Sequence, residues 1–301
     1  MDDIVRHRRM RNQSRRVRYG TVVLSKVVHT SQGQDIVFGS GFVYARSNEW
    51  ILITASHAID KFEEIAEDKR EDQGGNWLFL KVPASNGPPV KFNLRTSQGF
   101  GLPALGEALL RENPDDERKG FFRACRESDI AFIVLPRRIK SLLKKAGLKP
   151  FTTENVRMFK QEEIHSAHKL EGFLFGVPMN SLEFDQASVE TSYYFKQLSV
   201  YVSDVAEESY LVVFGRNWSD QEHTGSINGM SGGPIVVLGH KEPAIIAVQS
   251  KEFFAETSDR ESSTPDTLWA FEFAHLQEVL TEMLIHLKRR SNLVKKSQKT
   301  S

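Results

Sequence analysis

The stretch Gly229-Met230-Ser231-Gly232-Gly233-Pro234, followed by the apolar run 235–238, decides how this chain is interpreted. Three of its six residues are glycine, which tolerates positive φ and lets another part of the backbone come close. Pro234 removes a backbone N–H where the apolar run begins. The pattern predicts a tight bend that holds the Ser231 hydroxyl outward, with backbone N–H groups nearby and a strand leading away. A Gly-rich turn with a solvated serine is the alternative, and the rest of the chain has to decide between the two.

The composition is that of an ordinary globular protein without a dominant charge. The 301 residues are 40% hydrophobic and 26% charged, and the net charge is +1. That balance creates no overall field that would attract nucleic acid or a membrane surface. A single cysteine, Cys125, excludes an intrachain disulfide and fits a reducing compartment. Because the sequence also lacks a run of roughly 18 apolar residues and the apolar segment of a secretory signal, we expect a soluble, cytoplasmic protein.

Short β-branched runs separated by Gly, Asn and Ser turns make up both halves of the sequence, which is typical of an all-β fold. The runs expected as strands are 21–28, 36–44, 50–54, 76–82, 130–135, 170–177, 192–202, 211–214, 235–238, 244–250 and 269–273. Their spacing predicts an antiparallel barrel or sandwich. Gly39 and Gly41 inside the second run predict a bulge or a sharp bend.

Basic segments flank two β-rich parts, which we place at 19–150 and 151–273. Residues 1–18 contain seven arginines without apolar periodicity, which predicts a disordered basic arm. Contact of this arm with nucleic acid or another acidic partner is the alternative, although nucleic acid is not the partner we expect. Residues 274–290 have the apolar spacing of an amphipathic helix, and residues 291–301 form a basic tail.

Three residues have the types and the chain order of a catalytic triad. His57 stands where a predicted strand passes into a helix, and Asp129 stands immediately before an apolar run. A serine hydroxyl such as that of Ser231 is a weak nucleophile, so it needs a histidine base, and the histidine needs a carboxylate to fix its tautomer. Two of the three come from the first half and one from the second. We therefore expect a site between the halves.

The sequence around these residues resembles the trypsin-like (chymotrypsin-clan) serine peptidases. The motifs are T-A-S-H-A around His57, D-I-A-F-I-V-L at Asp129 and G-M-S-G-G-P around Ser231, and the segments 39–44 and 172–178 are similar to family strands. The resemblance covers roughly residues 18–270. Without disulfides, the intracellular or prokaryotic HtrA-like branch is the more similar one, here without a PDZ domain. The resemblance implies an all-β fold of two antiparallel β-barrels with the active site between them, 19–150 forming the first and 151–273 the second, to which the C-terminal amphipathic helix is added.

The resemblance also implies a role for each site residue. His57 is the general base and acid, Asp129 orients it, and Ser231 is the nucleophile. The backbone N–H groups of Gly229 and Ser231 form the oxyanion hole, and Ser250 lies where an extended substrate pairs with a strand edge. The implied activity is that of a serine endopeptidase that hydrolyses protein or peptide substrates through an acyl-enzyme. The activity needs neither a cofactor nor a metal.

Three departures from the family pattern concern activation and specificity. Met230 stands where zymogens of digestive enzymes have an aspartate, so activation by an N-terminal ion pair is not expected. Gly225 takes the place of an acidic residue at the base of the pocket, which predicts a small or apolar substrate side chain (P1) before the scissile bond. Residues 251–254 (KEFF) replace a glycine-containing pocket wall, so the pocket is expected to be reshaped.

Other interpretations remain open at this point. The chain could be a latent enzyme that a regulatory protein partner opens, or a non-catalytic protease-fold module that binds peptides or partner proteins. Gly-x-Ser-x-Gly also occurs at the nucleophile elbow of α/β-hydrolases, but that fold places a helix after the serine and the histidine last. His165 and His168 are spaced i, i+3 without a third ligand nearby, so we expect no metal site there.

Overall fold

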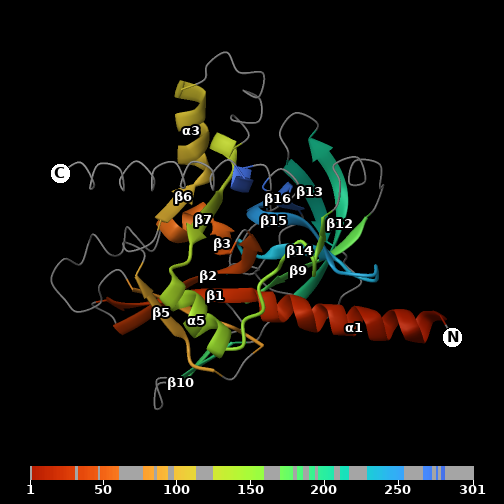
Figure 1. Ribbon diagram of the computed structural model, residues 1–301, viewed down its shortest axis with the longest axis horizontal. Helices are drawn as coiled ribbons and strands as arrows, with labels where there is room; N and C mark the ends of the chain where they lie inside the picture. Colours follow the sequence, from red (N-terminus) through yellow and green to blue (C-terminus); the bar gives the residue numbers. More distant parts are fainter. Residues whose placement is uncertain are drawn as a thin grey trace.

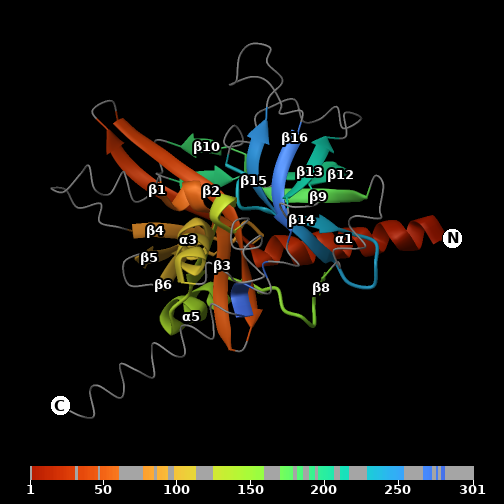
Figure 2. The ribbon, with the colours of Figure 1, turned by 90° about the horizontal axis from the view of Figure 1, so that it is seen from above.

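The computed structural model is mostly β, which confirms the fold class at that level. It describes residues 2–30, 33–46, 48–60, 77–84, 87–93, 98–112, 125–158, 170–178, 182–185, 190–193, 196–206, 211–216, 229–253, 267–272, 276 and 279–281. Two seven-stranded sheets lie side by side along the molecule, the first built from the N-terminal half and the second from the C-terminal half (Figures 1 and 2).

The first sheet is curled, and each neighbouring pair in it is antiparallel. In spatial order its strands are β5 (Val90–Asn93), β4 (Trp77–Lys81), β1 (Thr21–Thr30), β2 (Gly33–Arg46), β3 (Glu49–Ala55), β7 (Ile130–Val134) and β6 (Gln98–Gly101). The described pairings leave this sheet open between β5 and β6. It is therefore a curled sheet in these residues, whereas the sequence analysis expected a closed barrel.

The second sheet closes on itself through a pairing between β14 and β15. In spatial order its strands are β14 (Pro234–Val237), β9 (Glu171–Gly176), β12 (Lys196–Ala206), β13 (Leu211–Arg216), β16 (Thr267–Glu272), β15 (Ala244–Phe253) and β8 (Arg157–Met158). Six of them, β14 to β15, form a ring of antiparallel neighbours, and β8 adds to β15 in parallel. A separate hairpin joins β10 (Leu182–Asp185) and β11 (Glu190–Tyr193).

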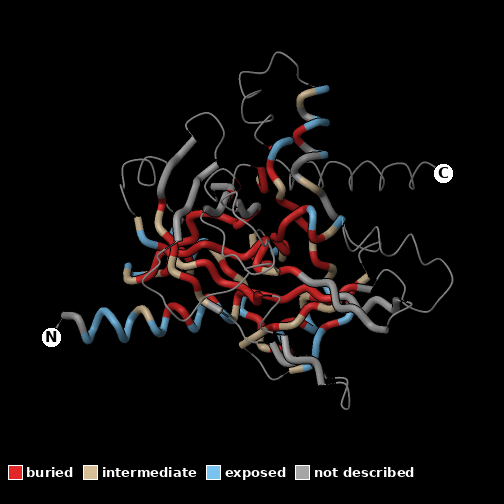
Figure 3. Tube along the Cα trace, turned by 180° about the vertical axis from the view of Figure 1, so that it is seen from behind, coloured by how far each residue is buried: buried red, intermediate tan, exposed pale blue. Residues whose placement is uncertain are grey.

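Buried residues run through both sheets and gather at the centre of the molecule (Figure 3). One apolar cluster contains Phe42 and Ile53 from the first sheet together with Phe175 and Val248 from the second. A second cluster packs the first sheet against α5, and a third fills the second sheet and includes Met230. The halves therefore share one continuous core.

Helices lie outside the sheets. They are α1 (Asp2–Gly20), α3 (Leu102–Glu112) and α5 (Arg137–Lys145), and residues 56–60 are also helical. In the part of the chain that the structure describes, no helix is long and apolar enough to cross a membrane.

The basic N-terminal arm is a helix, so the expectation of disorder at 1–18 is wrong. Its buried positions are Gln13, Ser14 and Val17, with Met10 partly buried, a spacing of i, i+3, i+4 and i+7. Two of these four are polar, which hid the helical periodicity from a search for apolar residues. Arginine is a good helix former, and the docked face supplies the tertiary contacts that a helix of this length needs.

The bulge predicted at Gly39 or Gly41 is absent from the pairing of β2 with β1. The register of these two strands is continuous. Glycine at position 41 serves close packing instead, because a Cβ there would lie 2.7 Å from the carbonyl oxygen of Ile53.

The predicted C-terminal helix lies outside the described residues except at 276 and 279–281, which are helical. The basic tail at 291–301 and the two histidines at 165 and 168 lie outside them as well.

Candidate active site

His57 and Asp129 meet because their strands are neighbours with opposite directions. Ala55, the last residue of β3, is paired with Ile130, the first residue of β7. The chain just after β3 therefore lies beside the chain just before β7. The backbone N–H of His57 donates to Asp129 Oδ1 at 2.8 Å, and the ring Nδ1 of His57 contacts Asp129 Oδ2. The N–H of Ser56 donates to the Asp129 carbonyl at 2.9 Å.

This pair leaves one nitrogen of the imidazole for another partner. The Asp129 side chain is 13% exposed, whereas the His57 side chain is 53% exposed. A carboxylate that accepts a hydrogen bond from Nδ1–H selects the tautomer in which Nε2 is unprotonated. His57 can therefore accept a proton at Nε2 from a group placed above it.

The loop of Ser231 is a tight bend, as the glycine pattern predicts. Gly229 has φ +92° and Gly232 has φ +86°, both in the left-handed region that favours glycine. A Cβ on Gly232 would lie 2.5 Å from the backbone nitrogen of Ala55 and 2.6 Å from Thr54 Oγ1. The bend thus rests directly on the end of β3, two residues before His57.

Ser40 of β2 ties the bend to both sheets. Its N–H donates to the Ser231 carbonyl at 3.0 Å, and its hydroxyl donates to the Gly229 carbonyl at 2.8 Å. The same hydroxyl accepts the N–H of Val177, just after β9, at 3.1 Å. Thr54 Oγ1 in turn donates to the Ser40 carbonyl at 2.7 Å. One fully buried serine therefore fixes the bend relative to β3 and to the second sheet.

From the other side, the bend is held by β15. The N–H of Gly232 donates to the Gln249 carbonyl at 2.8 Å, and the N–H of Gln249 donates to the Gly233 carbonyl at 3.0 Å. The N–H of Gly233 donates to the Met230 carbonyl at 2.8 Å, which closes the turn. Met230 itself is completely buried in the apolar cluster of the second sheet.

Two backbone amides of the bend remain available for a ligand. Within the described residues, neither the N–H of Gly229 nor that of Ser231 donates to an acceptor. They lie two residues apart in a bend whose φ values are fixed by glycine. Unused N–H groups of this kind can stabilise a negative oxygen.

Ser231 and His57 are brought near each other without a direct bond. A Cβ built on Gly39 would lie 3.1 Å from Ala58 Cβ and 3.7 Å from the Ser231 carbonyl oxygen, so Gly39 separates the two segments. Among the described hydrogen bonds, none joins the Ser231 hydroxyl to the imidazole of His57. The Ser231 residue is 9% exposed.

Of the two residues expected to bind substrate, the structure describes Ser250 but not Gly225. Ser250 follows Gln249 in β15 and is 3% exposed. Gly225 lies outside the described residues. In the KEFF segment, β15 continues to Phe253, and residue 254 lies outside the described part. Among the described residues, no group of three or more His, Cys, Asp or Glu side chains could hold a metal ion.

Ser40 and Gln249 are the site residues that the sequence analysis missed. Ser40 lies in the G-S-G-F-V-Y segment, whose glycines drew attention to its backbone and not to the serine between them. Gln249 is a polar residue inside an apolar run (A-I-I-A-V-Q-S). This exception to the apolar pattern is the feature by which the sequence could have revealed it. Its side chain is fully buried, and neither amide atom has a hydrogen-bond partner among the described residues.

Comparisons with known proteins add little. No protein-family model matches the chain, and no curated protein matches its sequence. Among solved structures, the active form of the Rv3671c protease from M. tuberculosis is similar, with a TM-score of 0.44 and 11% sequence identity. That similarity covers 90% of this chain and 84% of the protease chain. What this chain does therefore has to be inferred from its own residues.

Proposed function

We propose that the chain is a trypsin-like serine endopeptidase of the HtrA-like kind, with a site between its two β-rich halves. The observation that carries the proposal is that the His57–Asp129 pair and the Ser231 bend are both built on the end of β3. The pair comes from the first sheet and the bend from the second. Within the described residues, no acceptor bonds to the N–H of Gly229 or to that of Ser231.

The proposed reaction follows from these positions. The Ser231 hydroxyl attacks a peptide carbonyl while His57 Nε2 accepts its proton, and Asp129 stabilises the imidazolium that forms. The N–H groups of Gly229 and Ser231 bind the oxygen of the tetrahedral intermediate, and each donor of this kind is worth about 2.7–4 kcal/mol of barrier. His57 then protonates the leaving amine. Water hydrolyses the acyl-enzyme by the same route in reverse.

For substrate recognition we propose a protein or peptide in extended form. Ser250 lies in a strand next to the Ser231 bend, where main-chain pairing with a substrate is favourable. Gly225 brings no charge to the pocket, so a small or apolar P1 side chain fits. The chemistry uses no cofactor or metal, and buried Cys125 suits a cytoplasmic enzyme.

The test of this function is covalent labelling. A fluorophosphonate probe is expected to label the wild-type chain and not the Ser231→Ala variant, because the probe reacts with an activated serine. Ser141→Ala, on the exposed side of α5, is the matched control and should be labelled like wild type. Circular dichroism shows whether each variant is folded. Labelling that persists in folded Ser231→Ala would refute the proposal.

A latent enzyme is the second candidate, and one observation favours it. The described hydrogen bonds do not join Ser231 to His57, although the two segments are packed close together. Hydrogen bonds of this kind often tighten only when substrate binds. Labelling of the purified chain without additions assigns constitutive activity. Labelling that needs an added partner protein or peptide assigns latency.

A further inference from the structure

α1 concentrates positive charge that the proposed catalytic function does not use. The helix contains seven arginines and no lysine, and its acidic residues, Asp2 and Asp3, both stand in the first turn. All seven arginines are exposed, whereas the side chains of α1 described as buried or half-buried are uncharged. The net charge of the whole chain is only +1, but a basic helix attracts an anionic partner through its local field.

The N-terminal half of α1, residues 2–11, extends beyond the two sheets (Figures 1 and 3). Of its described side chains, only that of Met10 is partly buried against the core. Because a helix turns about 100° per residue, Arg9 and Arg11 lie about 100° to either side of Met10, and Arg8 lies about 160° from it. Arg8 therefore points away from the body of the protein, and Arg9 and Arg11 occupy opposite flanks of the helix.

These three guanidinium groups have no acidic partner among the described residues. Arg8, Arg9 and Arg11 form no ion pair there, whereas Arg16 further along the helix pairs with Glu242 at 2.8 Å. An arginine without an intramolecular partner keeps its five N–H donors for a ligand. The N-terminal half of α1 is therefore a charged surface whose hydrogen-bonding capacity is directed outward.

A hollow beside α1 extends this basic surface. Its volume is about 320 Å³, and it lies between the helix and residues 241–242. Its lining contains the basic residues Arg8, Arg9, Arg16 and Lys241 and one acidic residue, Glu242. Since Glu242 pairs with Arg16, three positive charges remain there without an acidic partner among the described residues. Phosphate groups suit such a place, because arginine binds them through paired hydrogen bonds.

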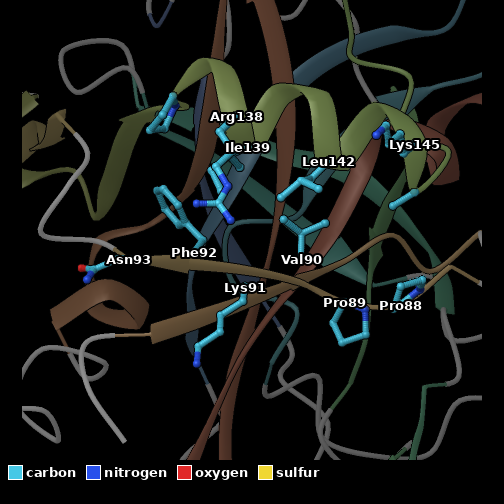
Figure 4. Close-up of a pocket in the computed structure, with 12 residues that line it drawn as sticks. Pro88, Pro89, Val90, Lys91, Phe92, Asn93, Arg138, Ile139, Leu142 and Lys145 are labelled. Carbon is cyan, nitrogen blue, oxygen red and sulfur yellow. The ribbon is translucent and has the colours of Figure 1, made fainter.

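The larger hollow beside α5 has a different character (Figure 4). Its volume is about 630 Å³, but Val90, Phe92 and Ile139 in its walls are buried residues of the first sheet's core. Leu142 is the one exposed large apolar side chain among its lining residues. This hollow is therefore a seam of the core. With five basic residues and no acidic one, α5 nevertheless provides a comparison helix of like charge.

The exposed side of α1 suits a chain of phosphates better than a lipid surface. A helix that binds a membrane presents an apolar face to it. In α1, however, Met10 and Val17 face the protein, and the exposed large apolar residues Ile4 and Val5 lie in the first two turns. The arginines from Arg8 to Arg16 extend over about 12 Å of helix. A DNA strand has one phosphate per about 3.4 Å of its axis, so this length faces three to four phosphates.

We propose that α1 binds double-stranded DNA, with its N-terminal half in the major groove. The groove is about 12 Å wide in B-form DNA and admits an α-helix, whose diameter is about 10–12 Å. Arg9 and Arg11, on opposite flanks, contact phosphates of the two strands. Arg8 and Asn12 lie between them on the outward side and face the base edges, with which arginine and asparagine can form hydrogen bonds. The proposal does not depend on the protease function.

The test is fluorescence anisotropy of a fluorescein-labelled DNA duplex of about 20 base pairs with the full chain. The variant Arg8→Gln/Arg9→Gln/Arg11→Gln removes three charges and keeps the helix, because glutamine and arginine have similar helix propensities. We expect its Kd to rise about tenfold or more at about 50 mM salt. The slope of log K against log salt concentration should become shallower by about 2.7, since each lost phosphate contact changes it by about 0.9.

The matched control is Arg137→Gln/Arg138→Gln/Lys144→Gln. It removes the same charge from exposed positions of α5, where Figure 4 shows Arg138. Because these residues lie on another helix, the Kd and the salt slope should stay those of the wild type. Circular dichroism shows whether both variants keep their helical signal. Equal weakening by the two variants would mean that net charge alone, and not α1, attracts the DNA, and would overturn the proposal.

A second arm leaves the protein unchanged and tests the groove. Double-stranded RNA of the same sequence has a deep, narrow major groove that side chains do not enter, so it should bind at least about tenfold more weakly than the DNA. Equal binding of the two duplexes would refute insertion of the helix. No binding of DNA at about 100 µM protein and about 50 mM salt would refute the whole proposal.

Two further outcomes would identify another partner. Displacement of the DNA by polyglutamate at equal concentration of charge would make α1 a site for acidic proteins. Co-sedimentation with vesicles of phosphatidylcholine and about one-third phosphatidylserine, lost in the α1 variant and without binding of DNA, would make it a membrane site. Either result would overturn the assignment to DNA. The expected result is displacement by unlabelled duplex at a concentration of charge at least about tenfold lower than polyglutamate requires.

Discussion

Gly232 is required for two separate reasons, and both act on the bend that carries Ser231. Its φ of +86° lies in the left-handed region, which costs an L-residue about 1–2 kcal/mol. A Cβ there would also lie 2.4 Å from the Ser40 carbonyl oxygen and 2.5 Å from the Ala55 nitrogen. These contacts are with backbone atoms, which no side-chain rotation can relieve. Substitution would push the bend away from the end of β3.

Gly239 has the positive φ of Gly232 without its close backbone contacts, so it allows the two effects to be measured separately. Its φ is +97°, but a Cβ there would meet only side-chain atoms, at 3.8 Å or more. We expect Gly239→Ala to lower the free energy of unfolding by about 1–2 kcal/mol. Gly232→Ala should cost about 1–3 kcal/mol more, the usual range for overpacking, and should abolish fluorophosphonate labelling. Urea denaturation measures both costs, and equal losses in the two variants would contradict this explanation.

Gln249 holds a buried amide without a partner among the described residues, and the cost should be measurable. Replacing an unsatisfied buried polar group by an apolar one of similar shape removes a desolvation penalty of about 1–3 kcal/mol. We therefore expect Gln249→Met to raise the free energy of unfolding. Gln13→Met is the control, because both amide atoms of buried Gln13 are hydrogen-bonded, to the His240 carbonyl and the Gly239 N–H. The control should lose stability, and a loss in both would show that Gln249 has a partner.

At the scale of elements, α1 divides into a docked half and a projecting half (Figures 1 and 3). The docked half is held by Gln13, by Ser14 Oγ donating to Gln197 Oε1 at 2.6 Å, and by the Arg16–Glu242 ion pair at 2.8 Å. The projecting half exposes Ile4 and Val5. The stability of the helix therefore comes from its second half, where the contacts are.

Two valines on α1 test this division. Val17 is completely buried, whereas Val5 is 53% exposed. Val17→Ala removes two buried methyl groups and leaves a cavity, so we expect a loss of about 2 kcal/mol in the free energy of unfolding. Val5→Ala should change it by less than about 0.5 kcal/mol. Equal effects in chemical denaturation would mean that the helix is not docked through this face.

At the scale of the whole molecule, the two sheets are joined by core packing and by polar contacts at the site. The cluster with Phe42 and Phe175 spans both sheets, and the Ser40 hydroxyl bonds to backbone groups of the second half. Phe151, which follows α5, pairs with β2 and stacks edge-on against Phe42 at 5.7 Å. Neither sheet can unfold alone without exposing part of the shared cluster.

We therefore expect the chain to unfold in one transition. Tryptophan fluorescence and far-ultraviolet circular dichroism should give coincident urea curves, because loss of either sheet exposes the shared core of the other. Two separated transitions, or a proteolytic fragment of one half that keeps its β signal, would contradict a shared core. Phe42→Ala should move the whole curve to lower urea without splitting it.

Much of the secondary structure could be predicted because it depends on local patterns. The β-branched runs became strands, and the glycines around Ser231 became a bend with positive φ. Docking of α1 could not be predicted, since Gln13 and Ser14 are buried only because Gln197 and the 239–240 turn lie opposite them. The strand order, which in the described residues leaves the first sheet open and closes the second, likewise depends on pairings between distant segments.

Which residue types stand at strand ends and in the glycine bend follows from local sequence, since backbone preference and hydrophobic alternation act within a few residues. Which of these groups meet depends on the tertiary structure. Asp129 reaches His57 because β7 runs antiparallel to β3, and Ser231 comes near because Gly232 leaves room for Ser40 and Ala55. Such contacts join residues 72 to almost 200 positions apart. No local preference encodes them, because they depend on the packing of two sheets around one core.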